Sequence, residues 1–260
     1  MAEWEMPRIK KPFGTLLLQQ IGNKTIQSAF DQQFDAELKN TARNRRFAVL
    51  KVVFNWGIQR FPGCEKNPVI GLRIPAEAPR DRYVSDKDYA FILDIAPTRL
   101  QLIMRAIYLL RLRPSEARTI HRKLSEADNK AKKSGVVDDG ILVFRGKGSW
   151  GGLVEWSDDL LKWNTDCKTH NRDFITKWQI RDNKGNRITK GALDSMWRRV
   201  WAKAQLMLED GQVESIPDHY TLHDLKAKGL TDHPNKDAGH KSPKMREVYD
   251  REHRRELPTR

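Results

Sequence analysis

The sequence predicts a mainly α-helical protein with a small antiparallel β-sheet (α+β), arranged as two domains joined by a linker. Three observations predict this class. Apolar residues recur at helical spacing in several segments, short β-type runs flank one glycine-rich stretch, and three prolines fall within residues 67–80. The 260 residues are enough for two modest domains, each with its own core.

The first part of the chain is predicted to be helical. One helical pattern runs through residues 25–38 and a stronger one through residues 41–58. The apolar positions of the second helix share one face: Phe47, Leu50, Phe54 and Ile58. Its other sides carry four basic residues that are candidates for DNA contact: Arg43, Arg45, Arg46 and Lys51. A solvated charged face would give the same pattern, so both interpretations stay open.

Prolines separate this part from the rest. Pro62 breaks the second helix, and the prolines of residues 67–80 favour extended backbone over helix. We therefore place a helical domain at residues 1–75, a linker at residues 76–84 and a second domain at residues 85–260.

The second domain begins with two predicted helices. Ser85, with Asp88 three residues later, starts a helix that continues through Ile95. The next helix has a buried pattern: Leu100, Ile103, Met104, Ile107 and Leu110. Pro114 ends it and begins another helix, which puts Arg113 at a corner beside a helix N-terminus.

A β-hairpin and one more helix follow. Residues 141–144 and 153–156 are β-type runs around a glycine-rich tip that holds Lys147. Further on, an aromatic stripe has helical spacing: Leu193, Met196, Trp197, Val200, Trp201 and Ala204. We interpret this stripe as core rather than as a surface on which bases stack.

The charge balance calls for a polyanionic partner. The formal net charge is +14 and the isoelectric point is near 9.8, with an excess of +6 in residues 1–80 and +8 in residues 81–260. Phosphate backbones gain much of their affinity for proteins from Lys and Arg, so nucleic acid is the leading candidate. A basic protein whose charge only keeps it soluble, and which binds no nucleic acid, would have the same composition.

Other compositional features exclude several classes. The mean hydropathy is -0.71, and no apolar run is long enough to span a membrane. The first residues lack the apolar stretch of a signal peptide, and Cys64 and Cys167 are too few for a disulfide framework or a zinc site. A reducing, cytoplasmic setting is expected.

The second domain also contains the groups that hydroxyl attack on a phosphodiester requires. This chemistry needs a nucleophile, positive groups around the phosphate oxygens and an acid for the departing oxygen. The candidates, in chain order, are Arg113, Lys147, His223, Lys226, His240 and Tyr249. Each residue taken alone is more often structural, so the order of the set is what points to chemistry.

In this order the residues resemble the phage-integrase family of tyrosine site-specific recombinases. LRPSEARTI resembles the box of the first arginine, FRGKGS the lysine hairpin, TLHDLKAKG the His-x-x-Arg box, and AGHKSPKMREVYD the Gly-His box with its tyrosine nine residues on. VLKVVFNWGIQ and NPVIGLRIP resemble the last core-binding helix and the linker. The resemblance implies the tyrosine recombinase catalytic fold, preceded by a partial all-α core-binding domain.

The resemblance also implies roles. Tyr249 would attack the scissile phosphate and form a 3′-phosphotyrosyl link. Arg113, Lys226 and His240 would hold the non-bridging oxygens, Lys147 would protonate the leaving oxygen, and His223 would assist proton movement at the tyrosine. No cofactor or metal is implied.

The implied partner is double-stranded DNA at attachment sites, during integration of a phage or mobile element. Relatives recombine as a tetramer on two duplexes, and a directionality factor is a further candidate partner. The implied place is the nucleoid of a bacterial cytoplasm.

The sequence departs from the family pattern in three places. Position 226 is Lys where the pattern has Arg, and an ammonium is a point charge rather than a two-pronged fork. His223 and His240 are 17 residues apart, which is shorter than usual. The N-terminal part corresponds to about half of a core-binding domain, as in a truncated integrase, a prophage remnant or a naturally short form.

Alternatives therefore stay open. We favour a working recombinase, since position 226 is still cationic. A catalytically weak or inactive DNA-binding remnant is the second hypothesis. A type IB topoisomerase, which shares the phosphotyrosine chemistry, is disfavoured by the core-binding and linker resemblance.

Overall fold

The computed structural model of the chain describes residues 2–33, 40–72, 82–146 and 151–234. The chain forms two compact units, Met1–Pro79 and Arg80–Arg260. The division between them lies within the proline-containing stretch from which the linker was predicted. Each unit has a hydrophobic core of its own.

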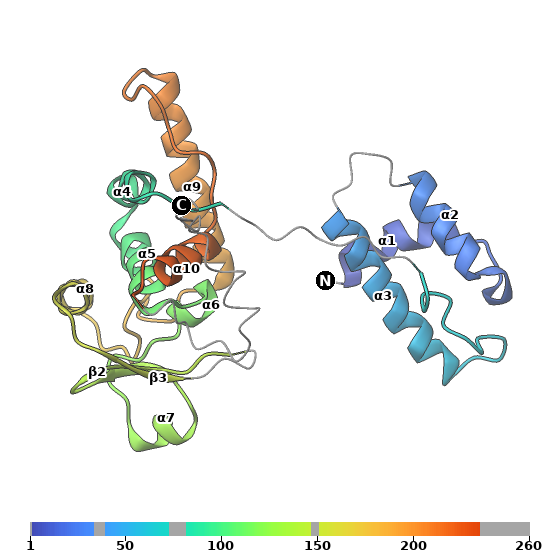
Figure 1. Cartoon of the computed structure of the whole chain (residues 1–260). Coiled ribbons are helices and arrows are strands. Elements are labelled where there is room, and N and C mark those ends of the chain that lie inside the picture. The colour runs from blue at the N-terminus through green and yellow to red at the C-terminus, as the bar shows by residue number, and fades with distance from the viewer. Residues whose placement is uncertain (1, 34–39, 73–81, 147–150, 235–260) are drawn as a thin grey trace, which may run out of the picture. The chain divides into compact units, whose positions relative to one another are not determined.

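The first unit is helical. It contains α1 (Ala2–Phe13), a short 3-10 turn at Leu18–Gln20, α2 (Asn23–Gln33) and α3 (Asn40–Ile58) (Figure 1). The unit's core includes the stacked rings of Phe30 and Phe47, whose centroids are 4.1 Å apart.

The predicted helix over residues 41–58 is confirmed, with one correction. Phe47, Leu50 and Phe54 are buried, but Ile58 is 39% exposed because the helix ends there. The predicted helix at 25–38 corresponds to α2, and residues 34–38 lie outside the described residues. The sequence did not predict α1, whose Pro7 and Pro12 argue against a helix.

The second unit surrounds one central helix. Its elements are α4 (Asp86–Ile95), α5 (Thr98–Leu110), α6 (Pro114–Ala117), α7 (Glu126–Lys130), β1 (Gly135–Val137), β2 (Gly140–Val143), β3 (Gly152–Glu155), α8 (Asp158–His170), α9 (Lys190–Glu209) and α10 (Leu222–Thr231) (Figure 1). Helix α5 packs against α4, α6, α8, α9 and α10, which explains why most of its residues are buried. It therefore positions the other helices of the unit.

A three-stranded antiparallel sheet of order β1-β2-β3 completes the unit. Val136 pairs with Ile141, and Leu142 pairs with Leu153. The predicted β-runs are confirmed as β2 and β3, each starting one residue earlier than expected. The tip that joins them, residues 147–150, lies outside the described residues.

The aromatic stripe on α9 belongs to the core, as predicted. Leu193, Met196, Trp197, Val200 and Ala204 are buried, and Trp201 packs against them while partly buried. This burial removes the stripe from the candidate DNA-binding surfaces.

Helix α10 lies unusually close to α5. A Cβ atom added to Gly229 would overlap the carbonyl oxygen of Tyr108, so only glycine allows this approach. Apart from His223, the residues of α10 are buried. The helix is thus held firmly against the centre of the unit, and it carries His223 and Lys226.

Candidate active site

The site is built on a sharp corner after α5. Arg111 ends that helix in the left-handed conformation, with φ of 52°, and turns the chain away from the core. Arg113 follows with extended backbone and is the N-cap of α6, whose first residue is Pro114. The predicted corner is therefore present, with the Arg113 side chain beside a helix N-terminus.

Glu116 fixes the Arg113 side chain. The Arg113 Nη1 atom donates to Glu116 Oε1 at 2.8 Å, and the Arg113 amide donates to Glu116 Oε2 at 2.7 Å. Glu116 Oε1 also accepts from the amide of Gly146 at 3.1 Å, and Arg113 Nη1 donates to the Gly146 carbonyl at 3.0 Å. One carboxylate thus joins the α6 corner to the end of the β2–β3 hairpin.

The guanidinium of Arg145 and the buried amine of Lys226 belong to the same site as Arg113 and Glu116. Arg145, next to Gly146, donates from Nη2 to the Leu110 carbonyl at 3.1 Å. Lys226, on α10, has no exposed surface. Burial, together with the charge of Arg113, lowers the pKa of Lys226 to about 8; Glu116 opposes this effect and Arg145 adds to it.

The resulting cluster has an excess of positive charge. Among the residues that the structure describes, the cations Arg113 and Arg145 and the carboxylate Glu116 act on the pKa of Lys226, itself a third cation. Three cationic groups from the α6 corner, the hairpin and α10 suit an anion with several oxygens, such as a phosphate. An anion bound there would stabilise the charged form of Lys226.

His223 lies at the N-terminal turn of α10, where its side chain is exposed. The turn is held by Asp224, whose Oδ2 atom accepts from the Thr221 amide at 2.7 Å and from the Thr221 hydroxyl at 2.6 Å. His223 and Lys226, three residues apart on one helix, therefore project from neighbouring positions.

Three predicted site residues lie outside the described residues: Lys147, His240 and Tyr249. The structure describes both ends of the glycine-rich tip that contains Lys147, and one of these ends, Gly146, belongs to the cluster. The roles of these three residues remain predictions.

Two residues of the cluster were not among the predicted site residues. Glu116 had a signal in the sequence, since a glutamate three residues after a helix N-cap commonly bonds back to the N-cap amide. Arg145 directly precedes Gly146 in the FRGKGS box, but no spacing rule links it to Lys226, 81 residues later.

The predicted DNA-binding residues of α3 have different surroundings. Arg45 and Lys51 are exposed, as a surface contact requires. Arg43 is partly buried and pairs with Asp31. Arg46 is only 7% exposed, which corrects its expected place on a solvent-facing flank. It lies four residues before the buried Leu50, so the two positions are neighbours on the helix surface.

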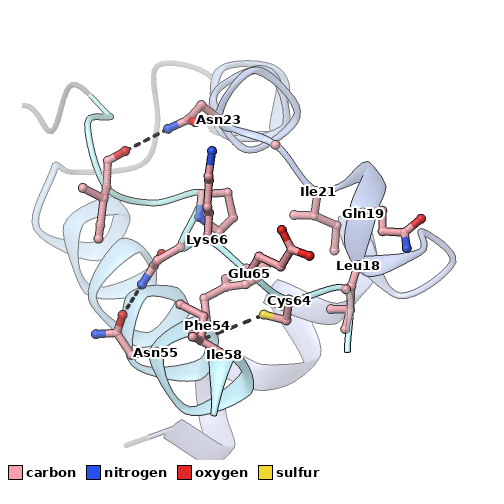
Figure 2. Close-up of a pocket in the computed structure, with 15 residues that line it drawn as sticks. Leu18, Gln19, Ile21, Asn23, Phe54, Asn55, Ile58, Cys64, Glu65 and Lys66 are labelled. Carbon is pink, nitrogen blue, oxygen red and sulfur yellow. Dashed lines mark hydrogen bonds between the residues drawn. The ribbon is translucent and has the colours of Figure 1, made fainter. Parts of the chain in front are cut away.

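The first unit contains a cavity of about 920 Å³. Figure 2 shows its mixed lining, with apolar Leu18 and Phe54 and polar Asn55, Glu65 and Lys66. None of the three candidate catalytic residues that the structure describes, Arg113, His223 and Lys226, lines this cavity. We therefore place the chemistry at the cation cluster of the second unit.

The described residues contain neither a candidate metal site nor a membrane-spanning helix. These residues contain no group of three or more His, Cys, Asp or Glu side chains suited to a metal ion. No helix among them has both the length and the apolar character needed to cross a membrane. Cys64 and Cys167 are buried free thiols.

Comparison with known proteins identifies the fold. No profile of a protein family and no curated protein sequence matches the chain. A λ integrase fragment of residues 75–356, solved as a dimer bound to a COC′ core site, is similar with a TM-score of 0.72 and 17% identity, over 99% of this chain and 89% of that one.

Two other structures agree. A λ integrase tetramer bound to a Holliday junction has a TM-score of 0.69 and 17% identity, over 99% of this chain and 73% of that chain. The Tn1549 transposon integrase, in complex with circular intermediate DNA, has a TM-score of 0.65 and 15% identity. The match covers 95% of this chain and 87% of that chain. The chain therefore has the integrase fold, as the resemblance predicted.

Proposed function

We propose that the chain is a site-specific DNA recombinase that integrates a phage or mobile element by cutting and rejoining DNA strands through a 3′-phosphotyrosine intermediate. The cluster of Arg113, Arg145 and Lys226, set in an integrase fold, is the observation that carries the proposal. The solved integrases with this fold are described in complex with DNA, which supports double-stranded DNA as the substrate.

The proposed reaction balances without an external energy source. The phenol oxygen of Tyr249 attacks the phosphorus, the bond from phosphorus to the 5′ oxygen breaks, and the phosphate stays joined to the 3′ end of the strand. His223 assists removal of the phenol proton, and Lys147 supplies a proton to the departing 5′ oxygen. Attack by a 5′ hydroxyl on the phosphotyrosine reverses these steps and rejoins a strand.

The cation cluster meets the main demand of this chemistry. A tyrosine with an ordinary pKa of about 10 is a weak nucleophile near neutral pH, so the charge that develops on the phosphate must be stabilised. Arg113 is already held by Glu116, which avoids an ordering cost when DNA binds. Lys226 and His240 complete the proposed set around the non-bridging oxygens, and Arg145 adds a further positive charge that acts on Lys226.

Lys226 also supports the second hypothesis, a DNA-binding remnant with weak or absent cleavage. Its amine cannot grip two phosphate oxygens as a guanidinium does, and its lowered pKa brings loss of the proton close to neutral pH. This hypothesis predicts salt-sensitive DNA binding without covalent chemistry.

The test measures covalent adduct formation on a nicked suicide substrate whose sequence is taken from the DNA that flanks the gene for this chain. We expect wild-type chain to form a denaturant-resistant protein–DNA adduct. Arg113→Ala should lower the rate at least on the order of 100-fold, because it removes charge stabilisation in the transition state. Binding of the substrate with no adduct would favour the remnant.

A further inference from the structure

A second concentration of positive charge lies outside the candidate active site, in the segment that joins α8 to α9 (Figure 1). Residues 172–189, here called the basic loop, contain five basic and two acidic residues. The basic residues are Arg172, Lys177, Arg181, Lys184 and Arg187, and all of them except Arg181 are exposed. Lys190, the first residue of α9, pairs with Asp194 and is not counted in the loop.

The basic loop has a defined conformation. Asp182 Oδ1 accepts from the amides of Lys184 and Asn186, both at 2.8 Å. Gly185 takes a φ of 80° in this turn, and its carbonyl accepts from the Thr176 hydroxyl at 2.7 Å. The carboxylate of Asp182 therefore stabilises the turn itself and forms no ion pair with a described Lys or Arg.

Three arginines from the rest of the unit converge on the loop. Arg118 Nη1 donates to the Ile188 carbonyl at 2.6 Å, and Arg122 Nη1 donates to the Phe174 carbonyl at 3.4 Å. Arg99 donates to the side-chain oxygen of Asn183. Among the described residues none of these arginines pairs with a carboxylate, so their positive charges add to those of the loop.

The cations are close enough to disfavour one another. Burial lowers the pKa of Arg181, and the charge of Arg99 lowers it further, while Asp182 and Asp173 oppose the effect. Burial lowers the pKa of Arg118, to which Arg187 adds and which Asp194 opposes. Burial also lowers the pKa of His170, and the charges of Arg181 and Arg99 add to that effect. A polyanion would relieve this repulsion.

Some hydrogen-bonding capacity at the base of the loop is unused. The Nε atom of Arg181, a side chain that is 7% exposed, is buried without a hydrogen-bond partner among the described atoms. The same holds for Arg99 Nε and His170 Nε2.

The basic loop lies next to the candidate active site. Arg118, which holds Ile188, is the C-cap of α6, and Arg113 is the N-cap of the same four-residue helix. From there the loop extends to Arg99 at the start of α5, while Arg113 follows the end of that helix. A 13-residue helix is about 20 Å long, which is the span of several phosphates along a DNA strand.

We infer that the basic loop, with Arg99 and Arg118, is a DNA-backbone-binding surface that continues from the active site along the duplex. The identity of the polyanion as DNA rests on the proposed function. The surface recognises phosphates and not base sequence, because exposed Lys and Arg side chains provide charge without a fixed donor pattern for bases. It would strengthen binding at any site.

The test compares two triple variants of the full chain that lose the same charge. One is Lys177→Ala/Lys184→Ala/Arg187→Ala in the basic loop. The control is Lys87→Ala/Lys130→Ala/Lys162→Ala, three exposed lysines of α4, α7 and α8. The probe is a mixed-sequence duplex of about 30 base pairs, three helical turns, and its Kd is measured from low to high salt.

Each lost phosphate contact lowers the slope of log K against log salt by about 0.9, so the loop variant should lose a slope of about 3. Its Kd should rise on the order of tenfold or more at about 0.1 M salt, while the control should stay within about twofold. Equal losses in both variants, or wild-type binding by the loop variant, would overturn the inference. Adduct formation is scored separately, so failure of the proposed chemistry leaves this binding result intact.

Discussion

Lys226 and Lys228 are two residues apart on α10 and both are buried, but their amines have opposite electrostatic surroundings. Lys228 Nζ lies 2.6 Å from Asp86 Oδ1 and 2.9 Å from Asp232 Oδ2, and donates to the Tyr83 hydroxyl at 3.1 Å. Lys226 lies among the charges of Arg113, Arg145 and Glu116. The charge of the first amine is balanced by two carboxylates, and the second amine adds to a cluster with an excess of positive charge.

Lys228 should be important for stability. Burial lowers its pKa, but hydrogen bonds with Asp86, Asp232 and Tyr83 outweigh burial and raise the pKa above its ordinary value. Its stabilisation is therefore complete below the ordinary value of 10.5 and is lost only as pH rises through the higher folded value. We expect Lys228→Met to lower the free energy of unfolding by about 2–3 kcal/mol.

The measurement for Lys228 is urea unfolding at neutral pH. The matched control is Lys87→Met, an exposed lysine on α4, which should change stability by at most about 0.5 kcal/mol. Equal small effects of the two variants would show that the Lys228 network contributes nothing to the fold.

Lys226 should make the reaction sensitive to pH. With a pKa of about 8, the amine of the DNA-free chain loses its charge as pH rises through that value. Rates at subsaturating DNA report the free enzyme, so wild-type adduct formation should fall above pH 8 relative to Lys226→Arg, which stays charged. The measurement is the ratio of the two rates from about pH 6 to 10, and a constant ratio would contradict the account.

Glu116 should act as a positioning residue. It holds Arg113 and the Gly146 amide and raises the pKa of Lys226. Glu116→Gln should slow adduct formation about tenfold or more and move the Lys226 inflection to lower pH, an effect that a merely structural role would not produce. Glu155→Gln, an exposed glutamate on β3, is the control. An unshifted pH profile in Glu116→Gln would argue against this electrostatic link.

The close packing of α10 on α5 gives a further prediction. Gly229→Ala would place a methyl group on the Tyr108 carbonyl oxygen, so we expect a loss of about 2–3 kcal/mol in stability. Gly191→Ala, at the start of α9, meets nothing within 4 Å and should be neutral or stabilising by up to about 1 kcal/mol. Thermal unfolding compares the two, and similar melting temperatures would contradict the close fit between the two helices.

Much of the fold could be predicted because periodicity is a local signal. The apolar spacing of the sequence predicted helices α3, α5 and α9, and the β-type runs predicted the β2–β3 pair. Helix α8 was missed, although Ser157 is its N-cap and its buried positions recur at helical spacing: Leu160, Trp163, Asn164 and Cys167. Strand β1 has three residues, and its Val136 is fixed by pairing with Ile141 rather than by any local preference.

The site could be predicted only in part. The order of the boxes predicted Arg113 and Lys226, which both belong to the cation cluster, and Glu116 was open to prediction from helix capping. The contrast between Lys226 and Lys228 could not be predicted, because Asp86 is 142 residues from Lys228 in sequence. Contacts at such separation depend on the packing of α4 against the rest of the unit.

The most direct test of the proposed function is the identity of the residue that joins DNA. Adduct trapped on the suicide substrate is digested with protease and nuclease, and the modified peptide is sequenced by mass spectrometry. We predict one modified residue, Tyr249, linked to the 3′ phosphate, and no adduct from Tyr249→Phe. Adduct that persists in Tyr249→Phe, or a link at another residue, would contradict the proposed function.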